Sequence, residues 1–146
     1  MTADRPPREQ RRGRRIAMTP DERDEFLRAQ RTCRVATVGG DGEAMWLNTL
    51  VRSQRWTNLE RDPRVSVLVD AGEDYFELQG VELLGRVERV GSAPRVDEPD
   101  PALEVPERLF GEKYTGGQFF IDGAHAWMRL VPEKIVSWDF TKLGQG

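Results

Sequence analysis

The stretch WLNTLVRSQRWTNLERDPRVSVLVD, residues 46–70, predicts a strand, a short helix and a second strand. Ser53 is a good helix N-cap, and the apolar residues Trp56 and Leu59 fall three positions apart on one helix face. Pro63 ends the helix, because the residue before a proline is pushed out of the helical region. The pattern therefore predicts a compact strand–helix–strand unit in the middle of the chain.

The charges of this helix run against its dipole. Arg52 and Arg55 stand at its start, whereas Glu60 and Asp62 stand at its end. The helix macrodipole favours the reverse order by roughly 0.3–1 kcal/mol per charge. A helix start also presents unpaired N–H groups, so the two arginines favour an anion site there, with the Ser53 hydroxyl either capping the helix or bonding a phosphate oxygen. The alternative is that both arginines reach carboxylates elsewhere on an acidic surface.

A second predicted helix has the opposite charge at its start. In TPDERDEFLRAQ, Thr19 can cap the helix, Pro20 suits the first helical position and Glu22 completes a capping box. Acidic residues fill its first turns, as the dipole prefers. This helix is therefore a built-in control for the helix in residues 53–62.

The rest of the chain predicts short antiparallel strands and one more helix. The helix is expected in PERLFGEKY, residues 106–114. Gly80 and Gly85 mark bends or bulges in a long strand, Asp41-Gly42 predicts a tight turn, and Pro132 is expected to separate the last two strands. The expected strands cover residues 34–38, 44–51, 64–70, 75–90, 125–131 and 134–140. Many short strands with few helices predict a mainly β fold, a closed or partly closed barrel.

Length and composition predict one intracellular domain. A chain of 146 residues with 38% hydrophobic content suits a single core. Cys33 is the only cysteine, so no internal disulfide forms. No apolar run approaches the roughly 20 residues of a membrane span, and the N-terminus is charged. We expect a cytoplasmic protein with no membrane contact.

The N-terminal segment differs in charge from the rest of the sequence. Residues 1–17 hold six arginines against two acidic residues, a net charge of +4 in a chain of −3, so the remainder carries −7. Two prolines and few apolar residues predict a disordered basic arm, followed by one domain over residues 18–143. The arm is either a solvated leader or contacts an anionic partner. Nucleic-acid binding is disfavoured, because the body of the protein is acidic.

The sequence shows no catalytic or metal-binding set of its own. His125 is the only histidine, and with one cysteine there is neither a zinc set nor a Ser/His/Asp constellation. On a predicted strand, His125 is interpreted as a surface or packing residue. Glu73 and Asp74 follow one another in a loop and are interpreted as solvated.

Together these segments resemble a known family. VATVGGDG, the stretch at residues 46–70 and GVELLGRVERV resemble the pyridoxamine 5′-phosphate oxidase-like split-barrel family, in particular its flavin/deazaflavin (F420)-dependent oxidoreductase branch. The likeness covers roughly residues 14–143. It implies a split β-barrel of antiparallel Greek-key type and a homodimer with cofactor at the interface. It also implies hydride transfer between coenzyme F420, or alternatively FMN, and a small organic substrate.

The resemblance also implies positions for the cofactor. In the family, the strand end and helix start hold the cofactor phosphate, and a later strand approaches the cofactor of the partner. Transferred to this sequence, the strand end, phosphate motif and later strand give these cofactor-binding residues: Asn48, Thr49, Arg52, Ser53, Gln54, Arg55, Trp56 and Trp138. Asn48 and Thr49 would lie along the ribityl chain. Gln54 replaces the usual basic residue, which weakens the phosphate grip. Trp138 has core packing as its alternative role.

One departure from the family pattern concerns the cofactor ring. The chain passes from GGDGEA directly to MWLNTL, as though one usual strand and turn were absent after Gly42. Either the barrel closes with fewer strands, or a partner fills the gap, or the ring side of the site is impaired. The last case gives the alternative function, a non-enzymatic dimeric module that binds flavin or haem.

Overall fold

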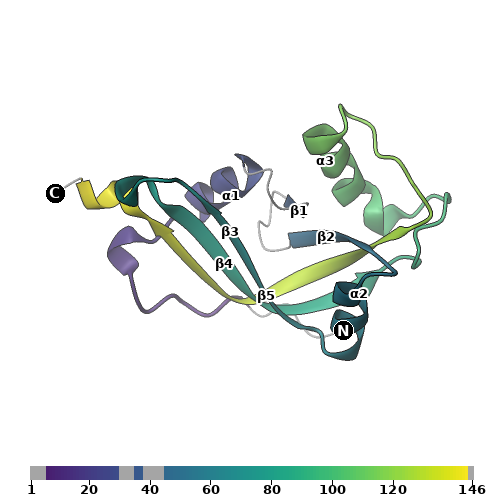
Figure 1. Ribbon diagram of the computed structural model, residues 1–146, viewed down its shortest axis with the longest axis horizontal. Helices are drawn as coiled ribbons and strands as arrows, with labels where there is room; N and C mark the ends of the chain where they lie inside the picture. The colour runs from purple at the N-terminus through teal and green to yellow at the C-terminus, as the bar shows by residue number, and fades with distance from the viewer. Residues whose placement is uncertain (1–5, 30–34, 38–44, 145–146) are drawn as a thin grey trace.

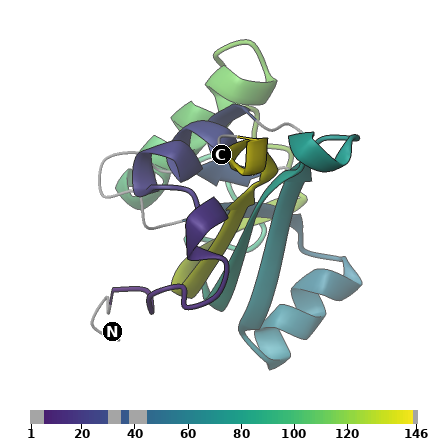
Figure 2. The ribbon, with the colours of Figure 1, turned by 90° about the vertical axis from the view of Figure 1, so that its left-hand side faces the viewer.

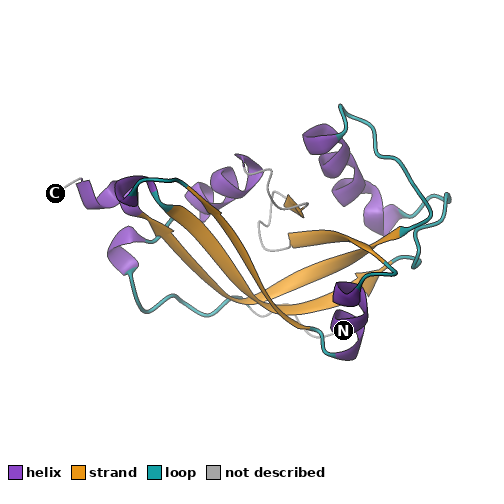
Figure 3. Ribbon diagram, viewed as in Figure 1, coloured by secondary structure: helices purple, strands orange, loops and turns teal. Residues whose placement is uncertain are grey.

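The computed structural model describes residues 6–29, 35–37 and 45–144, in which one curved antiparallel sheet carries helices around its rim (Figure 1; Figure 3). The sheet order is β1-β2-β5-β4-β3. The strands are β1 (Val35–Thr37), β2 (Met45–Leu50), β3 (Arg64–Ala71), β4 (Gln79–Val90) and β5 (His125–Asp139). The α-helices are α1 (Pro20–Ala29), α2 (Gln54–Arg61) and α3 (Glu104–Tyr114), and the 3-10 helices are η1 (Arg14–Ile16), η2 (Tyr75–Glu77), η3 (Pro101–Leu103) and η4 (Phe140–Gly144). This antiparallel half-barrel confirms the predicted fold class.

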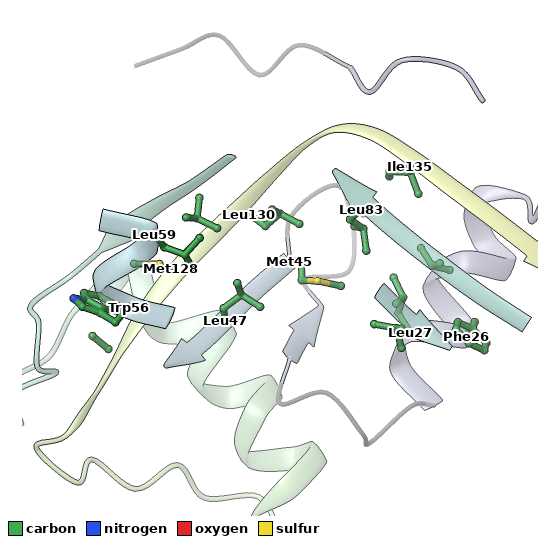
Figure 4. Packing of buried hydrophobic residues seen from close by; sticks show 14 of the residues in the cluster. Phe26, Leu27, Met45, Leu47, Trp56, Leu59, Leu83, Met128, Leu130 and Ile135 are labelled. Carbon is green, nitrogen blue, oxygen red and sulfur yellow. The ribbon is translucent and has the colours of Figure 1, made fainter. Parts of the chain in front are cut away.

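The main core lies on the concave face of the sheet. Side chains from β2, β3, β4 and β5 meet there, and α1 and α2 close the two ends of the cluster (Figure 4). Trp56 and Leu59 are the buried residues of α2, at 3% and 8% exposure, as their spacing predicts. A second cluster, formed by Trp46, Trp127 and Leu103, lies where α3 covers the other face of β2 and β5. The helix α2 is therefore fixed to the end of the barrel by its apolar edge.

The prediction that Pro132 separates two strands is wrong. One continuous strand, β5, passes through Pro132 and pairs with β4 from Trp127 to Asp139. The register shifts there, so that Pro132 pairs with Gly85 and Glu133 is the extra residue of a bulge. A bulge tolerates a residue without a ladder N–H. Gly85 is required opposite it, since a Cβ at that position would lie 2.1 Å from the Val131 carbonyl oxygen.

The long strand predicted over residues 75–90 is shorter than expected. Tyr75–Glu77 form η2, and β4 begins at Gln79. Gly80 pairs with Trp138 of β5, and an added Cβ would lie 2.2 Å from the Trp138 ring. Glycine at position 80 therefore leaves room for the Trp138 ring against the strand.

The N-terminal segment that composition predicts to be disordered is docked in its described part. Residues 1–5 lie outside the described residues, but residues 8–18 run beside β5 (Figure 2). The Arg8 N–H donates to the Glu133 carbonyl oxygen at 2.7 Å. Gln10 accepts from the Ser137 N–H at 2.9 Å and donates to the Ser137 carbonyl oxygen at 3.1 Å. Hydrogen bonds to a sheet edge need no apolar residues, so composition did not reveal this contact.

The predicted Asp41-Gly42 turn and the missing strand after Gly42 fall in residues 38–44, outside the described residues. On either side of that gap, β1 and β2 pair in antiparallel orientation, with Thr37 opposite Met45.

Candidate functional site

The start of α2 follows a tight turn at the end of β2. The Ser53 N–H donates to the Leu50 carbonyl oxygen at 3.0 Å and closes the turn. The Ser53 hydroxyl donates to the same carbonyl at 2.7 Å and accepts from the Trp56 N–H at 3.2 Å. Of the two roles predicted for this hydroxyl, the structure shows the N-cap. The next two N–H groups, of Gln54 and Arg55, have no acceptor within the described part of the chain.

The charges at the two ends of α2 differ in whether they are paired. Arg52 and Arg55 are exposed and form no ion pair or hydrogen bond with any residue that the structure describes. At the other end, Glu60 accepts from the Trp56 indole N–H, and Asp62 pairs with Arg64 at 2.6 Å. Hydrogen bonding to Arg64 lowers the pKa of Asp62 to about 2. The acidic residues at the C-terminal end of α2 thus have hydrogen-bond or ion-pair partners, while the arginines at its start have none among the described residues.

Gln54 is engaged along the helix rather than towards its start. Its side-chain amide donates to the Asn58 side-chain oxygen at 2.8 Å. Because the Gln54 side chain is neutral, the cationic character of the α2 start comes from Arg52, Arg55 and the free N–H groups.

The two polar residues of β2 point to opposite faces of the sheet. Successive strand residues alternate, so Thr49 shares the core face with Leu47, while Asn48 shares the other face with Trp46. Thr49 has no exposed surface, and its hydroxyl has no hydrogen-bond partner. The Asn48 Oδ1 atom is also buried without a partner. Asn48 is half-buried on the face of the second cluster and Thr49 is fully buried on the core face, and a contact of either residue with a ligand stays a prediction.

Of the remaining predicted site residues, Trp56 belongs to the first turn of α2 but is buried, and Trp138 lies apart from it. Trp56 is buried in the main core, where it anchors α2. Trp138 lies near the far end of β5 beside η4, whereas α2 lies near the other end (Figure 1). Within the chain, the structure brings together Asn48 and the 52–55 segment but not Trp138. A contribution of Trp138 to the partner's site stays a prediction.

One pair that the sequence interpretation missed lies beside this turn. The His125 Nδ1 atom lies 2.5 Å from Asp122 Oδ2, and the Asp122 Oδ1 atom accepts from the N–H groups of Ala124 and His125. Burial alone raises the pKa of Asp122, but these backbone hydrogen bonds and His125 outweigh it and lower the pKa overall. The spacing DGAH, with an acid three residues before the histidine, is the signal that could have indicated it.

Two further classes of site are not indicated. Within the described ranges, no group of three or more His, Cys, Asp or Glu residues is placed to hold a metal ion. Nor does any helix in the described part have the length and apolarity needed to cross a membrane.

Comparison with known proteins gives the family. The family model described as pyridoxamine 5′-phosphate oxidase matches residues 19–139. This chain belongs to that family. A crystal structure of a conserved hypothetical protein from Mycobacterium tuberculosis has 31% sequence identity, with a TM-score of 0.68 over 94% of this chain and 93% of that chain. No curated protein matches the sequence.

Two more distant structures share the fold of this family member. A FAD-binding protein from Mesorhizobium loti has 16% identity and a TM-score of 0.55, over 83% of this chain and 93% of that chain. A heme binding protein from Mycobacterium smegmatis has 17% identity and a TM-score of 0.51, over 88% of this chain and 61% of that chain. At this identity the likeness concerns the fold alone.

Proposed function

We propose that this protein is an oxidoreductase that binds a phosphorylated flavin-type cofactor at the start of α2. Coenzyme F420 is the first choice, because residues 46–70 resemble the deazaflavin branch of the family, and FMN is the alternative. The observation that carries the proposal is the pair of exposed arginines, Arg52 and Arg55, with no partner in the described part of an acidic protein.

The residues at the α2 start fit a phosphate group. Two free N–H groups and about half a positive charge from the helix dipole lie beside two guanidinium groups, which bind phosphate oxygens in bidentate geometry. Ser53 keeps the turn closed by its two hydrogen bonds. Asn48 offers an unpartnered acceptor on the adjoining strand, suited to a hydroxyl of the cofactor's polyol chain. A bound phosphate would compensate the charge that the helix start leaves unfavourable.

When bound, the cofactor would supply hydride transfer to or from a small organic substrate, while the protein supplies binding and orientation. The residues of this chain hold the anionic end and leave the ring end free for the substrate. We further propose a homodimer, in which the Trp138 end of the partner lies near this site.

The test is a charge reversal at the helix start. Arg55→Glu replaces a phosphate donor by a repelling charge, and we expect the affinity for F420 or FMN to fall by about 100-fold, a loss of roughly 2.7 kcal/mol. Fluorescence titration of the bound cofactor measures it. Arg61→Glu is the matched control, because Arg61 is equally exposed but lies at the opposite end of α2. It should leave the affinity within about twofold.

The choice among cofactors is settled by absorbance after desalting. Protein incubated separately with F420, FMN and haem should retain the deazaflavin band, or alternatively the flavin band, in proportion to protein. Retention of haem alone, or equal cofactor affinity in the Arg55→Glu and wild-type proteins, would remove the proposal. Retained flavin with no reduction of any acceptor would leave the binding module as the function.

A further inference from the structure

The Asp122–His125 pair lies next to the turn that starts α2. Leu50, the last residue of β2, pairs directly with His125. The Val51 N–H donates to the Ala124 carbonyl oxygen at 3.0 Å, which extends the ladder by one step into the turn. Paired Cα atoms of antiparallel strands are about 4.5–5.5 Å apart. The ladder thus places the start of β5 beside the segment that carries Arg52.

The imidazole is held by one ring nitrogen and leaves the other available. Nδ1 contacts Asp122, so the proton of the neutral ring belongs on Nδ1. No described residue forms a hydrogen bond with the second nitrogen, Nε2, and 22% of the side chain is exposed. Nε2 accepts a hydrogen bond when the ring is neutral and donates one when it is protonated.

The orientation of His125 follows from strand pairing. Residues directly opposite in an antiparallel pair share a face, so His125 lies on the face of Leu50 and Asn48. This is the face on which Asn48 Oδ1 is buried without a partner. Thr49 lies on the other face. His125 is therefore paired with Leu50, the residue that lies between Asn48 and Arg52 along the chain.

We propose that His125 is a further cofactor-binding residue, whose Nε2 contacts the phosphate of the ligand and whose protonated form binds it more tightly. Asp122 acts as its positioning residue, since it fixes the tautomer and stabilises the charged ring. The inference rests on the proposed function and assigns His125 to the anionic end of that same site.

The other charges near the ring already have partners. In the loop after β4, the backbone N–H of Arg95 donates to the His125 carbonyl oxygen. The Arg95 guanidinium pairs with Glu107 of α3 at 2.9 Å. On β5, Arg129 pairs with Glu88 of β4 at 3.1 Å. Of the remaining charged groups, Asp122 contacts the ring directly, and Arg52 lies on the turn next to the start of β5 with no partner among the described residues.

The single histidine makes a direct experiment possible. Its ring resonances in the full chain need no assignment, so NMR can follow its protonation against pH without ligand, with FMN, with F420 and with phosphate-free riboflavin. The titration midpoint should move up by about 0.5–1 pH unit with FMN or F420 and stay in place with riboflavin. That corresponds to about 3- to 10-fold tighter binding by the protonated form.

A variant provides a second measurement. His125→Gln keeps a hydrogen-bond donor but not the charge, and it should lower the affinity for FMN or F420 about 3- to 10-fold at pH 5.5 and little at pH 8.5. A cofactor that binds without moving the midpoint, or that shifts it no more than riboflavin does, overturns this inference alone. Absence of binding by both cofactors overturns it together with the proposed function.

Discussion

The starts of α1 and α2 differ in how their N–H groups and charges are satisfied. At α1, Thr19 and Glu22 form a reciprocal capping box, with hydrogen bonds of 2.8 and 3.2 Å. Glu22 also accepts from Lys142 at 2.8 Å. At α2, Ser53 caps one N–H, but no acid lies in the first turn and the nearby arginines are unpaired within the described residues. The first start is complete within the protein, and the second is completed by a ligand in our proposal.

The difference shows how a binding site differs from a structural helix end. Both helices bury an apolar edge in the same core, so neither depends on its first turn alone for its position. The acidic first turn of α1 can then stabilise the protein, while in our proposal the arginines at the start of α2 bind a ligand. The predictions below test that division by changing each start separately.

The largest effect on the free energy of unfolding is expected at the start of α1. The double variant Thr19→Ala/Glu22→Ala removes the capping box and the Lys142 contact, and it should lower the free energy of unfolding by about 1–2 kcal/mol in urea denaturation. Cofactor affinity should not change, because α1 lies at the other end of the core. A stability loss below about 0.3 kcal/mol would mean that the α1 start is not the stabilising one.

Thr49, on the strand before α2, should lower the free energy of unfolding. Thr49→Val keeps the side-chain shape but removes a buried hydroxyl without a partner, so it should raise the free energy of unfolding by about 1 kcal/mol. Thr49 is fully buried, so cofactor affinity should stay the same. The matched control is Ser137→Ala, which should destabilise the protein, because the buried Ser137 hydroxyl accepts from the Met18 N–H at 2.8 Å. A destabilised Thr49→Val variant would contradict this assignment.

Charge reversal along α2 should give a smaller effect whose sign depends on position. Without cofactor, Arg55→Glu should raise the free energy of unfolding by about 0.3–1 kcal/mol, and Arg61→Glu should lower it by a similar amount, because the helix dipole favours acids at its start and bases at its end. Urea denaturation at low salt measures both. If Arg55→Glu were the more damaging of the two, Arg55 would be a structural residue rather than one reserved for a ligand.

The smallest expected effect is the pH dependence of the α1 start. Hydrogen bonding to Lys142, then to Thr19, lowers the pKa of Glu22 from its ordinary value of 4.5. Its contribution is therefore present above pH 4.5 and lost as the pH falls through the lowered folded-state pKa. The stability difference between wild type and Glu22→Gln should shrink over that window in acid denaturation. A difference that stays constant with pH would exclude this linkage.

Local sequence signals predicted the elements that define this comparison. Thr19 and Glu22 predicted the α1 cap, and Ser53, Trp56 and Pro63 predicted the extent and buried face of α2, because capping and helical spacing act over three or four residues. The strand expected over residues 64–70 corresponds to β3 (Arg64–Ala71). Pro132 misled because a bulge depends on the strand opposite, which local sequence does not reveal.

The features of the candidate site also divide into those predicted from local sequence and those set by the pairing of distant strands. By itself, the sequence predicted a mainly β fold, the strand–helix unit and the cationic start of α2, since these patterns depend on neighbours along the chain. The split barrel was implied by the resemblance to the family. Only the tertiary structure decided that Thr49 and not Asn48 faces the main core, that Trp138 lies far from α2 within the chain, and that His125 lies beside the turn. Those relations depend on pairing between strands distant in sequence, where one residue of register changes the face of every side chain.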